Sequence, residues 1–259
     1  MKIPRLTLTC ILLTLIAALP AMAGPRTFVS GLGNDANPGT REQPKRTFAS
    51  ALTVTNPGGQ IVALDSAGYA SSTLTINKSV SIIVPPGVAG FITVSGSSSG
   101  IIINAPTDAV VSIRGLIIEN SSRTGEPSGI RSNSVGTLTV EDCAIRNFDT
   151  GIFFYQPNAG HLQVHGGSIR NTQYGIYVVP SAAVALDAIV TGCFVENNYG
   201  GLVSQAASDG TSRLTAGDCT ISGNRYGLIS GGGELISFGN NSFANNSDNG
   251  FFTSTTPRF

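Results

Sequence analysis

The sequence predicts an all-β fold, a single-stranded right-handed parallel β-helix solenoid with a short N-terminal capping helix. Three observations lead to this prediction. A glycine followed by an apolar residue recurs at intervals of 22 to 26 residues, an asparagine stands four positions before most of these glycines, and the composition favours short strands. The 259-residue chain has 32 glycines and only 12% charged residues, about half the charged fraction of an ordinary soluble domain.

The first 23 residues have the layout of a secretory signal peptide. Lys2 and Arg5 give a basic start, residues 6–19 form an apolar run, and residues 21–23 match a small-x-small cleavage site. The run is shorter than the roughly 20 residues that span a bilayer. We therefore expect cleavage near Ala23, export to the periplasm or the extracellular medium, and no membrane insertion of the mature chain.

Residues 24–58 are expected to form an N-terminal segment with the capping helix, and residues 59–259 the β-helix itself. The helix is predicted from Thr47, which can cap its first turn, to Val54, and the Pro-Gly-Gly of residues 57–59 can end it. It would cover the first coil, which has no preceding coil to pack on. Early strands are predicted at 61–64, 74–76, 80–84 and 91–94, and residues 121–127 are expected to form an inserted loop.

The later coils follow one register. Because a unit of this length cannot bury its own apolar face, successive units must stack, and equivalent residues then lie about 4.8 Å apart. Asparagine suits a stacked turn, since it tolerates left-handed backbone and its amides can hydrogen-bond along the stack. The predicted Gly–apolar pairs begin at Gly129, Gly151, Gly175, Gly201, Gly227 and Gly250, the inward column contains Ile145, Ile169, Val195 and Ile221, and the turn column contains Asn147, Asn171, Asn197 and Asn246.

Three cysteines of the mature chain share one inward column. Cys143, Cys193 and Cys219 occupy equivalent positions, with Gly167 between the first two. They are expected to pack as small buried side chains, and a Cys193–Cys219 disulfide is the alternative.

In this register, the chain from Phe28 onwards resembles the pectin lyase-like superfamily of right-handed parallel β-helices. The Asn-turn-Gly-Ile repeats, the capping segment at 45–52 and the segment Asp-Ala-Asn-Pro-Gly-Thr at 35–40 carry the resemblance. The last of these is similar to the start of many exported bacterial members, most of which have no assigned activity. The resemblance therefore implies a fold and no particular reaction.

The motifs of the enzymes in that superfamily do not carry over. No proline stands in the Arg-x-Pro-x-x-Arg pattern of pectate lyases, and the blocks of polygalacturonases and pectin methylesterases are missing. The segments around His161 and His165 only half match the Gly-His-Gly block of polygalacturonases. The residues themselves indicate no cofactor and no metal, and Ca²⁺ enters only by analogy with the family. The sequence leaves open whether the protein is an enzyme; if it is one, a polysaccharide lyase or a glycoside hydrolase is expected.

The candidate catalytic residues lie on one outward strand face. Strand parity places them in two columns, with Gln163 between the two histidines as a candidate binding residue. A histidine would act as general acid or base, a carboxylate would orient it, and an arginine would clamp a uronate carboxylate. In enzymes of the resembled superfamily the equivalent face carries the substrate groove. The columns are Arg114, Glu141 and His165 in one, and His161, Asp187 and Arg213 in the other.

Two other interpretations of this face stay open. Charges of alternating sign are also what a solvated strand face needs, because like charges stacked at this distance repel. A His–carboxylate metal site is disfavoured, since histidines four residues apart on a strand diverge.

A second outward column is largely apolar. It could stack sugar rings, bind another protein chain, or lie beneath the C-terminal residues 253–259, which is the preferred interpretation. Arg131, Phe153 and Tyr177 are its candidate binding residues. The full column is Arg131, Phe153, Tyr177, Val203, Ile229 and Phe252.

Two functions follow from these faces. The first is an exported protein that binds extracellular or envelope polysaccharide along the outward sheet face. A stronger version of this hypothesis is that the protein also cleaves the polysaccharide. The alternative is a non-catalytic envelope or surface scaffold that makes protein contacts through the apolar column. The formal net charge is zero and lysines and arginines do not cluster, so nucleic acid is not an expected partner. The oligomeric state is not indicated.

Overall fold

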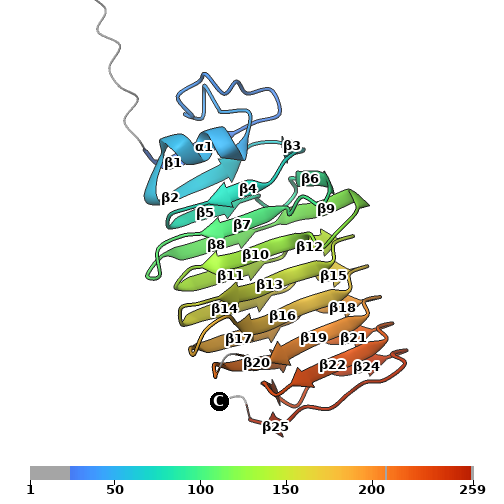
Figure 1. Cartoon of the computed structure of the whole chain (residues 1–259). Helices are drawn as coiled ribbons and strands as arrows, with labels where there is room; N and C mark the ends of the chain where they lie inside the picture. Colours follow the sequence, from blue (N-terminus) through green and yellow to red (C-terminus); the bar gives the residue numbers. More distant parts are fainter. Residues whose placement is uncertain (1–23, 208, 258–259) are drawn as a thin grey trace, which may run out of the picture.

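The protein is a parallel β-helix in which successive coils stack along one axis, as predicted. The computed structural model describes residues 24–207 and 209–257, so the predicted signal peptide lies outside the described residues. Within them, the strands form three parallel sheets that run the length of the stack, and α1 (Phe48–Val54) lies at its N-terminal end (Figure 1).

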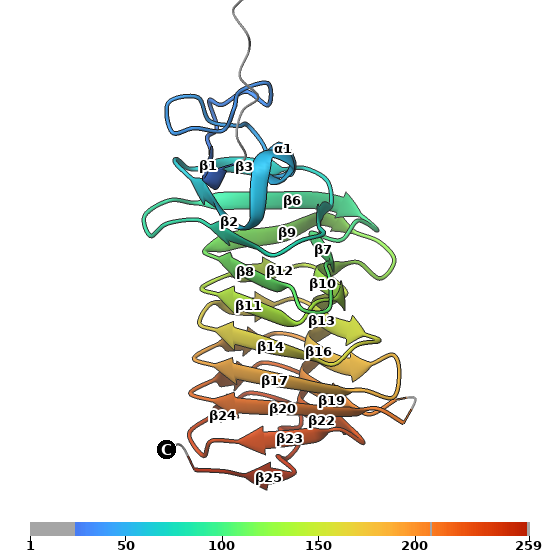
Figure 2. The ribbon, with the colours of Figure 1, turned by 90° about the vertical axis from the view of Figure 1, so that its left-hand side faces the viewer.

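The central coils each contribute one strand to each sheet, and the coils at the two ends are incomplete. Sheet A contains β1 (Gly24–Val29), β2 (Thr55–Ala63), β5 (Val80–Ile83), β8 (Val110–Arg114), β11 (Thr137–Glu141), β14 (Gly160–His165), β17 (Ala185–Thr191), β20 (Thr211–Gly217), β23 (Glu234–Ser237) and β25 (Ser254–Thr255). Sheet B contains β3 (Ala67–Ala70), β6 (Gly90–Gly96), β9 (Leu116–Arg123), β12 (Ala144–Arg146), β15 (Ser168–Arg170), β18 (Phe194–Glu196), β21 (Thr220–Ser222) and β24 (Ser242–Ala244). Sheet C contains β4 (Leu74–Ile76), β7 (Ile101–Asn104), β10 (Ser128–Ser134), β13 (Thr150–Gln156), β16 (Tyr174–Pro180), β19 (Gly200–Gln205) and β22 (Tyr226–Gly231). Figure 2 shows the face of sheet A.

The predicted register is confirmed over the central coils. In sheet B, Ile145 pairs with Ile169, Ile169 with Val195, and Val195 with Ile221, and all four side chains are buried. Like residues therefore stack on like, which gives the continuous apolar core that a solenoid needs.

The glycine of each Gly–apolar pair is required by close stacking. A Cβ atom on Gly151 would lie 2.4 Å from Cγ2 of Ile169 and 2.5 Å from the carbonyl oxygen of Gly175. Any side chain at this position would push two coils apart, so the recurrence of glycine reflects contact between coils.

The turn between sheets B and C differs in one residue from its prediction. Its left-handed positions are Asn147, Asn171, Asn197, Gly223 and Asn245, with φ between 56° and 64°. In the last coil Asn245 therefore holds the place predicted for Asn246.

The main asparagine ladder lies one residue further along. Asn198 and Asn224 are buried, and the side-chain oxygens of Asn224 and Asn246 accept hydrogen bonds from the backbone N–H groups of Asn198 and Asn224, both at 2.9 Å. Between members of the predicted column, the described residues form one amide contact, from Asn171 to Asn147 at 3.4 Å. The inward position shields its hydrogen bonds from water, whereas Asn147 and Asn171 face solvent more openly.

The capping helix is confirmed. The Thr47 hydroxyl accepts a hydrogen bond from the Ser50 N–H at 3.1 Å, and Phe48, Ala51 and Leu52 are buried beneath the helix. The helix ends at Val54, ahead of the predicted Pro-Gly-Gly, because Thr55 already begins β2 and pairs with β1. At the next predicted loop, 121–127, β9 continues through Arg123 by pairing with β6.

The last coil corrects two predictions. Tyr226 bridges to Asp248, and a Cβ atom on Gly227 would meet the carbonyl oxygen of Asn249, so Gly250 stands one position out of register. Phe251, the apolar residue of the predicted Gly250–Phe251 pair, is consequently 77% exposed. Phe252 turns towards the core and packs on Phe243, with 6.0 Å between ring centroids, so it does not join the outward column.

The cysteines behave as small core residues. Cys143, Cys193 and Cys219 are buried free thiols, so the alternative of a disulfide does not form. Burial raises the pKa of Cys143 to about 12. Within the described residues, no helix has the length and apolar character needed to cross a bilayer.

Candidate functional site

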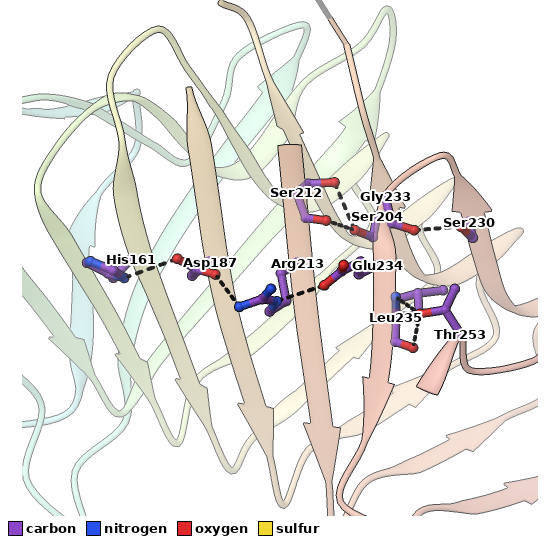
Figure 3. A network of polar contacts seen from close by, with 10 residues as sticks. All are labelled: His161, Asp187, Ser204, Ser212, Arg213, Ser230, Gly233, Glu234, Leu235 and Thr253. Atoms are coloured by element: carbon purple, nitrogen blue, oxygen red, sulfur yellow. Dashed lines mark hydrogen bonds and ion pairs between the residues drawn. The ribbon is translucent and has the colours of Figure 1, made fainter. Parts of the chain in front are cut away.

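The first polar column forms a continuous row on the face of sheet A. His161, Asp187, Arg213 and Glu234 follow one another in register on β14, β17, β20 and β23. We call these four residues the polar row. His161 Nδ1 lies 3.9 Å from Asp187 Oδ2, Arg213 Nη1 lies 3.9 Å from Asp187 Oδ1, and Arg213 Nε donates to Glu234 Oε2 at 2.8 Å (Figure 3).

The second polar column is brought together only in part. Arg114 Nε lies 3.7 Å from Glu141 Oε2, and Arg114 Nη2 lies 3.7 Å from Asp142 Oδ2. His165 stands beside Glu141 in the register, yet its Nδ1 makes a 2.9 Å hydrogen bond with the Thr191 hydroxyl on its other side. Thr191 therefore holds the imidazole, and Glu141 is engaged by Arg114.

A cleft opens beside the polar row. It has a volume of about 270 Å³ and is lined by the row members Asp187, Arg213 and Glu234 together with Ser212 and neighbouring backbone. The side chains of the row are 43% to 65% exposed. Gln163 is exposed on the same face, and Ile189, which follows it in register, is 45% exposed.

The charges of this face do not favour the predicted uronate clamp. Both guanidinium groups already face carboxylates, Arg114 those of Glu141 and Asp142, and Arg213 those of Asp187 and Glu234. The hydrogen bond to Glu234 raises the pKa of Arg213, which keeps the guanidinium charged and engaged. An acidic sugar would have to displace these carboxylates, whereas sugar hydroxyls could bind to carboxylate and guanidinium alike.

The side chains of the face do not fit a bound Ca²⁺. Across 24–207 and 209–257, no three His, Cys, Asp or Glu side chains gather into a group that could hold a metal ion. Calcium takes six to eight oxygen ligands, several of them from carboxylates.

The predicted apolar column lies on sheet C. Arg131, Phe153, Tyr177, Val203 and Ile229 pair in register, and the Arg131 guanidinium lies over the Phe153 ring, 5.0 Å from its centroid. Val203 is only 3% exposed and the Tyr177 hydroxyl donates a hydrogen bond to Gln205. Of the C-terminal residues that were predicted to cover this column, Ser254 and Thr255 instead pair with β23 in sheet A.

The sequence interpretation missed two groups of residues. Glu234 ends the polar row, and its signal was the alternation of Glu234, Leu235 and Ile236 one coil after Arg213. Tyr174, Tyr199 and Tyr226 gather beside the apolar column, and each is followed by glycine at the start of a sheet C strand. A recurring Tyr-Gly pair would have identified them.

Comparison with known proteins settles the family. The family model for the right-handed β-helix region matches residues 52–247. The chain belongs to this family. No curated protein matches the sequence of this β-helix protein.

Two solved structures match the chain, and the first of them shows a likeness of fold. The crystal structure of the pectate lyase Pel9A is 12% identical with a TM-score of 0.57, and the match covers 90% of this chain and 78% of that one. A rhamnogalacturonan lyase is 11% identical with a TM-score of 0.36, over 83% of this chain and 73% of that one. At this identity the pectate lyase shares the architecture of the β-helix protein, and the function has to be argued from the residues of the two faces.

Proposed function

We propose that this β-helix protein is exported and binds polysaccharide along the outward face of sheet A. One observation carries the proposal: the polar row lines a cleft on a face that continues from coil to coil. A long chain laid along the stack meets a new set of side chains at each coil, as polymer binding requires. The likeness of the fold to a pectate lyase supports a carbohydrate ligand by analogy.

The chemistry of the row suits sugar hydroxyls. Asp187 and Glu234 offer carboxylate acceptors and Arg213 offers guanidinium donors at the cleft. A sugar hydroxyl donates and accepts at once, so it can bridge a carboxylate and a guanidinium. The exposed Ile189 and Gln163 beside the row add one apolar and one amide contact.

Cleavage is the stronger form of the proposal. His161 is its candidate proton-transfer group, since Asp187 lies on the Nδ1 side of the ring and can hold the imidazole with Nε2 directed outward. Binding does not depend on this step.

The test uses the chain from Gly24 onwards on an array of plant, algal and bacterial polysaccharides, with and without Ca²⁺. We expect Arg213→Ala and Asp187→Asn to weaken binding at least tenfold, which is about 1.4 kcal/mol. The matched control is Arg170→Ala, because Arg170 lies on β15 of sheet B, away from the cleft. His161→Ala, tested for release of unsaturated or reducing ends, separates cleavage from binding.

Two results would contradict the proposal. One is the absence of binding to any polysaccharide on the array. The other is an equal loss in the sheet B control, which would mean that the arginine acts through stability. The proposed export is checked separately by sequencing the N-terminus of secreted material, which should begin at Gly24.

A further inference from the structure

Three hollows adjoin one another along the edge of sheet C at which the asparagine turn enters the sheet. Their volumes are about 180, 720 and 540 Å³. The first and second share Gln173, the first and third share Tyr174, and the second and third share Tyr199. They form one groove along the stack, which we call the turn groove.

Aromatic rings line this groove in an unbroken series. We call Phe153, Tyr177, Tyr174, Tyr199 and Tyr226 the aromatic row. Successive centroids are separated by 5.3, 5.1, 6.2 and 5.4 Å. Such intervals are comparable with the length of one pyranose unit, so consecutive sugars of a polysaccharide could each meet a ring. The C–H faces of sugars are apolar and pack on aromatic rings.

Five side chains of the groove make no hydrogen bond with the described residues. Gln173 and Asn197 are exposed, and within the described residues neither side-chain amide makes a hydrogen bond. The same holds for the hydroxyls of Tyr174, Tyr199 and Tyr226. Amides and phenols both donate and accept, which is the capacity that a ligand rich in hydroxyl groups uses.

The charges at the groove point to an uncharged ligand. The charged side chains that line it are two arginines and three carboxylates, so their sum is not positive. At the rims, Arg123 donates to the Phe148 carbonyl at 2.7 Å, and Asp248 accepts from the Gly250 N–H at 2.8 Å. The remaining charged side chains lining it are Arg131, Glu126 and Asp149.

One more cation lies nearby. The Arg225 guanidinium sits over the rings of Tyr199 and Tyr226, 5.3 and 5.5 Å from their centroids, in a cation–π arrangement. It does not line any of the three hollows. The lining of the groove thus has no excess of positive charge to hold a polyanion.

We infer that the turn groove is a second carbohydrate-binding site, separate from the face of sheet A, and that it takes a neutral polysaccharide. Rings supply the apolar contact, free amides and phenols supply the hydrogen bonds, and the coil spacing supplies the repeat. The inference does not rest on the function proposed for sheet A, because the two sites share no residue.

Because the chain has no tryptophan, ligand binding at the groove can be followed by tyrosine fluorescence. The chain has six tyrosines and no tryptophan, and four of the tyrosines belong to the aromatic row, so tyrosine emission reports on the groove. The probes are mixed-linkage β-glucan, galactomannan and arabinoxylan, with polygalacturonate as the acidic comparison. Titrations follow tyrosine emission, and affinity electrophoresis provides a second measurement.

We expect at least one neutral polysaccharide to bind, with an affinity that is insensitive to ionic strength because no ion pair is formed. Tyr199→Ala and Gln173→Ala should each weaken it about tenfold, or about 1.4 kcal/mol. Phe194→Ala is the matched control, since Phe194 is a 51% exposed aromatic residue on sheet B. In the Arg213→Ala background, Tyr199→Ala should weaken this affinity by the same factor, because the two sites share no residue.

Four results would overturn the inference. They are the failure of all three neutral probes to bind, salt-sensitive binding of polygalacturonate alone, an equal effect of Phe194→Ala, and the absence of any effect of Tyr199→Ala in the Arg213→Ala background. Sedimentation velocity adds a fifth: a dimer that Tyr199→Ala dissociates would assign the groove to a second copy of the chain.

Discussion

Replacement of Asn224 by alanine should destabilise the protein by about 3 kcal/mol. Asn224 is 2% exposed, its Nδ2 donates to the Val195 carbonyl at 2.9 Å, and its Oδ1 accepts from the Asn198 N–H at 2.9 Å. Alanine leaves the Asn198 N–H without an acceptor and removes a donor from Val195. Each buried polar group left without a partner costs about 1 to 3 kcal/mol, so two such groups give about 3 kcal/mol.

The assay is equilibrium unfolding in urea, followed by circular dichroism and tyrosine emission. With a slope of about 3 kcal/mol/M, a loss of about 3 kcal/mol moves the midpoint by about 1 M. The slope should be unchanged, because the substitution leaves the surface area that is exposed on unfolding nearly the same.

Asn171→Gly is the matched control for this experiment. Asn171 lies in the same turn with φ of 56° and faces solvent, and its one side-chain hydrogen bond within the described residues is the 3.4 Å bond to Asn147. Glycine adopts this backbone readily, as Gly223 does in a later coil at φ 64°. The control should stay within about 0.5 kcal/mol of the parent. Equal effects of the two substitutions would refute the view that the inner ladder holds the turns together.

Three further outcomes are expected. Gly151→Ala should cost about 3 kcal/mol in urea unfolding, since its Cβ would lie 2.4 Å from a neighbouring side chain, while Gly68→Ala, with nothing within 4 Å, should not. Burial raises the pKa of the Asp65 carboxyl, but hydrogen bonds from Ser30, Tyr69 and Gly31 outweigh it and leave that pKa below 3.8. The stability from Asp65 is thus present above pH 3.8 and lost as the pH falls through its folded value; a urea midpoint whose acid dependence is unchanged in Asp65→Asn would contradict this. Cys143, with a pKa raised to about 12 by burial, should react with a disulfide reagent at pH 8 only after unfolding, and labelling of the folded protein would count against it.

The sequence predicts the central coils well because stacking gives each position a strict requirement. A glycine in contact with the next coil and an inward aliphatic residue leave visible marks at a constant spacing, and Gly151 and Ile169 are examples. The last coil is harder, since adjacent asparagines at 245 and 246 allow two registers. Only the structure shows that Asn245 takes the left-handed position and that Gly250 stands one place out of register.

The candidate site illustrates a second limit of sequence reasoning. Register identifies both neighbours of an outward side chain, but the choice between them depends on side-chain length and competition. His165 bonds to Thr191 because Arg114 lies beside Glu141 on the other side. Three members of the aromatic row were missed for a related reason: Tyr174, Tyr199 and Tyr226 precede the Gly–apolar pairs and so lie outside the positions that were compared.

The slip in the last coil has a consequence for solubility. A stack whose final coil stayed in register would present three long strand edges, ready to template another chain and grow into fibres. Here the final strand of sheet A, β25, has only two residues, and the displaced segment turns Phe252 onto Phe243 at the base of the core. A short, irregular edge of this kind disfavours pairing with another chain, and restoring the regular repeat there is expected to promote fibrils.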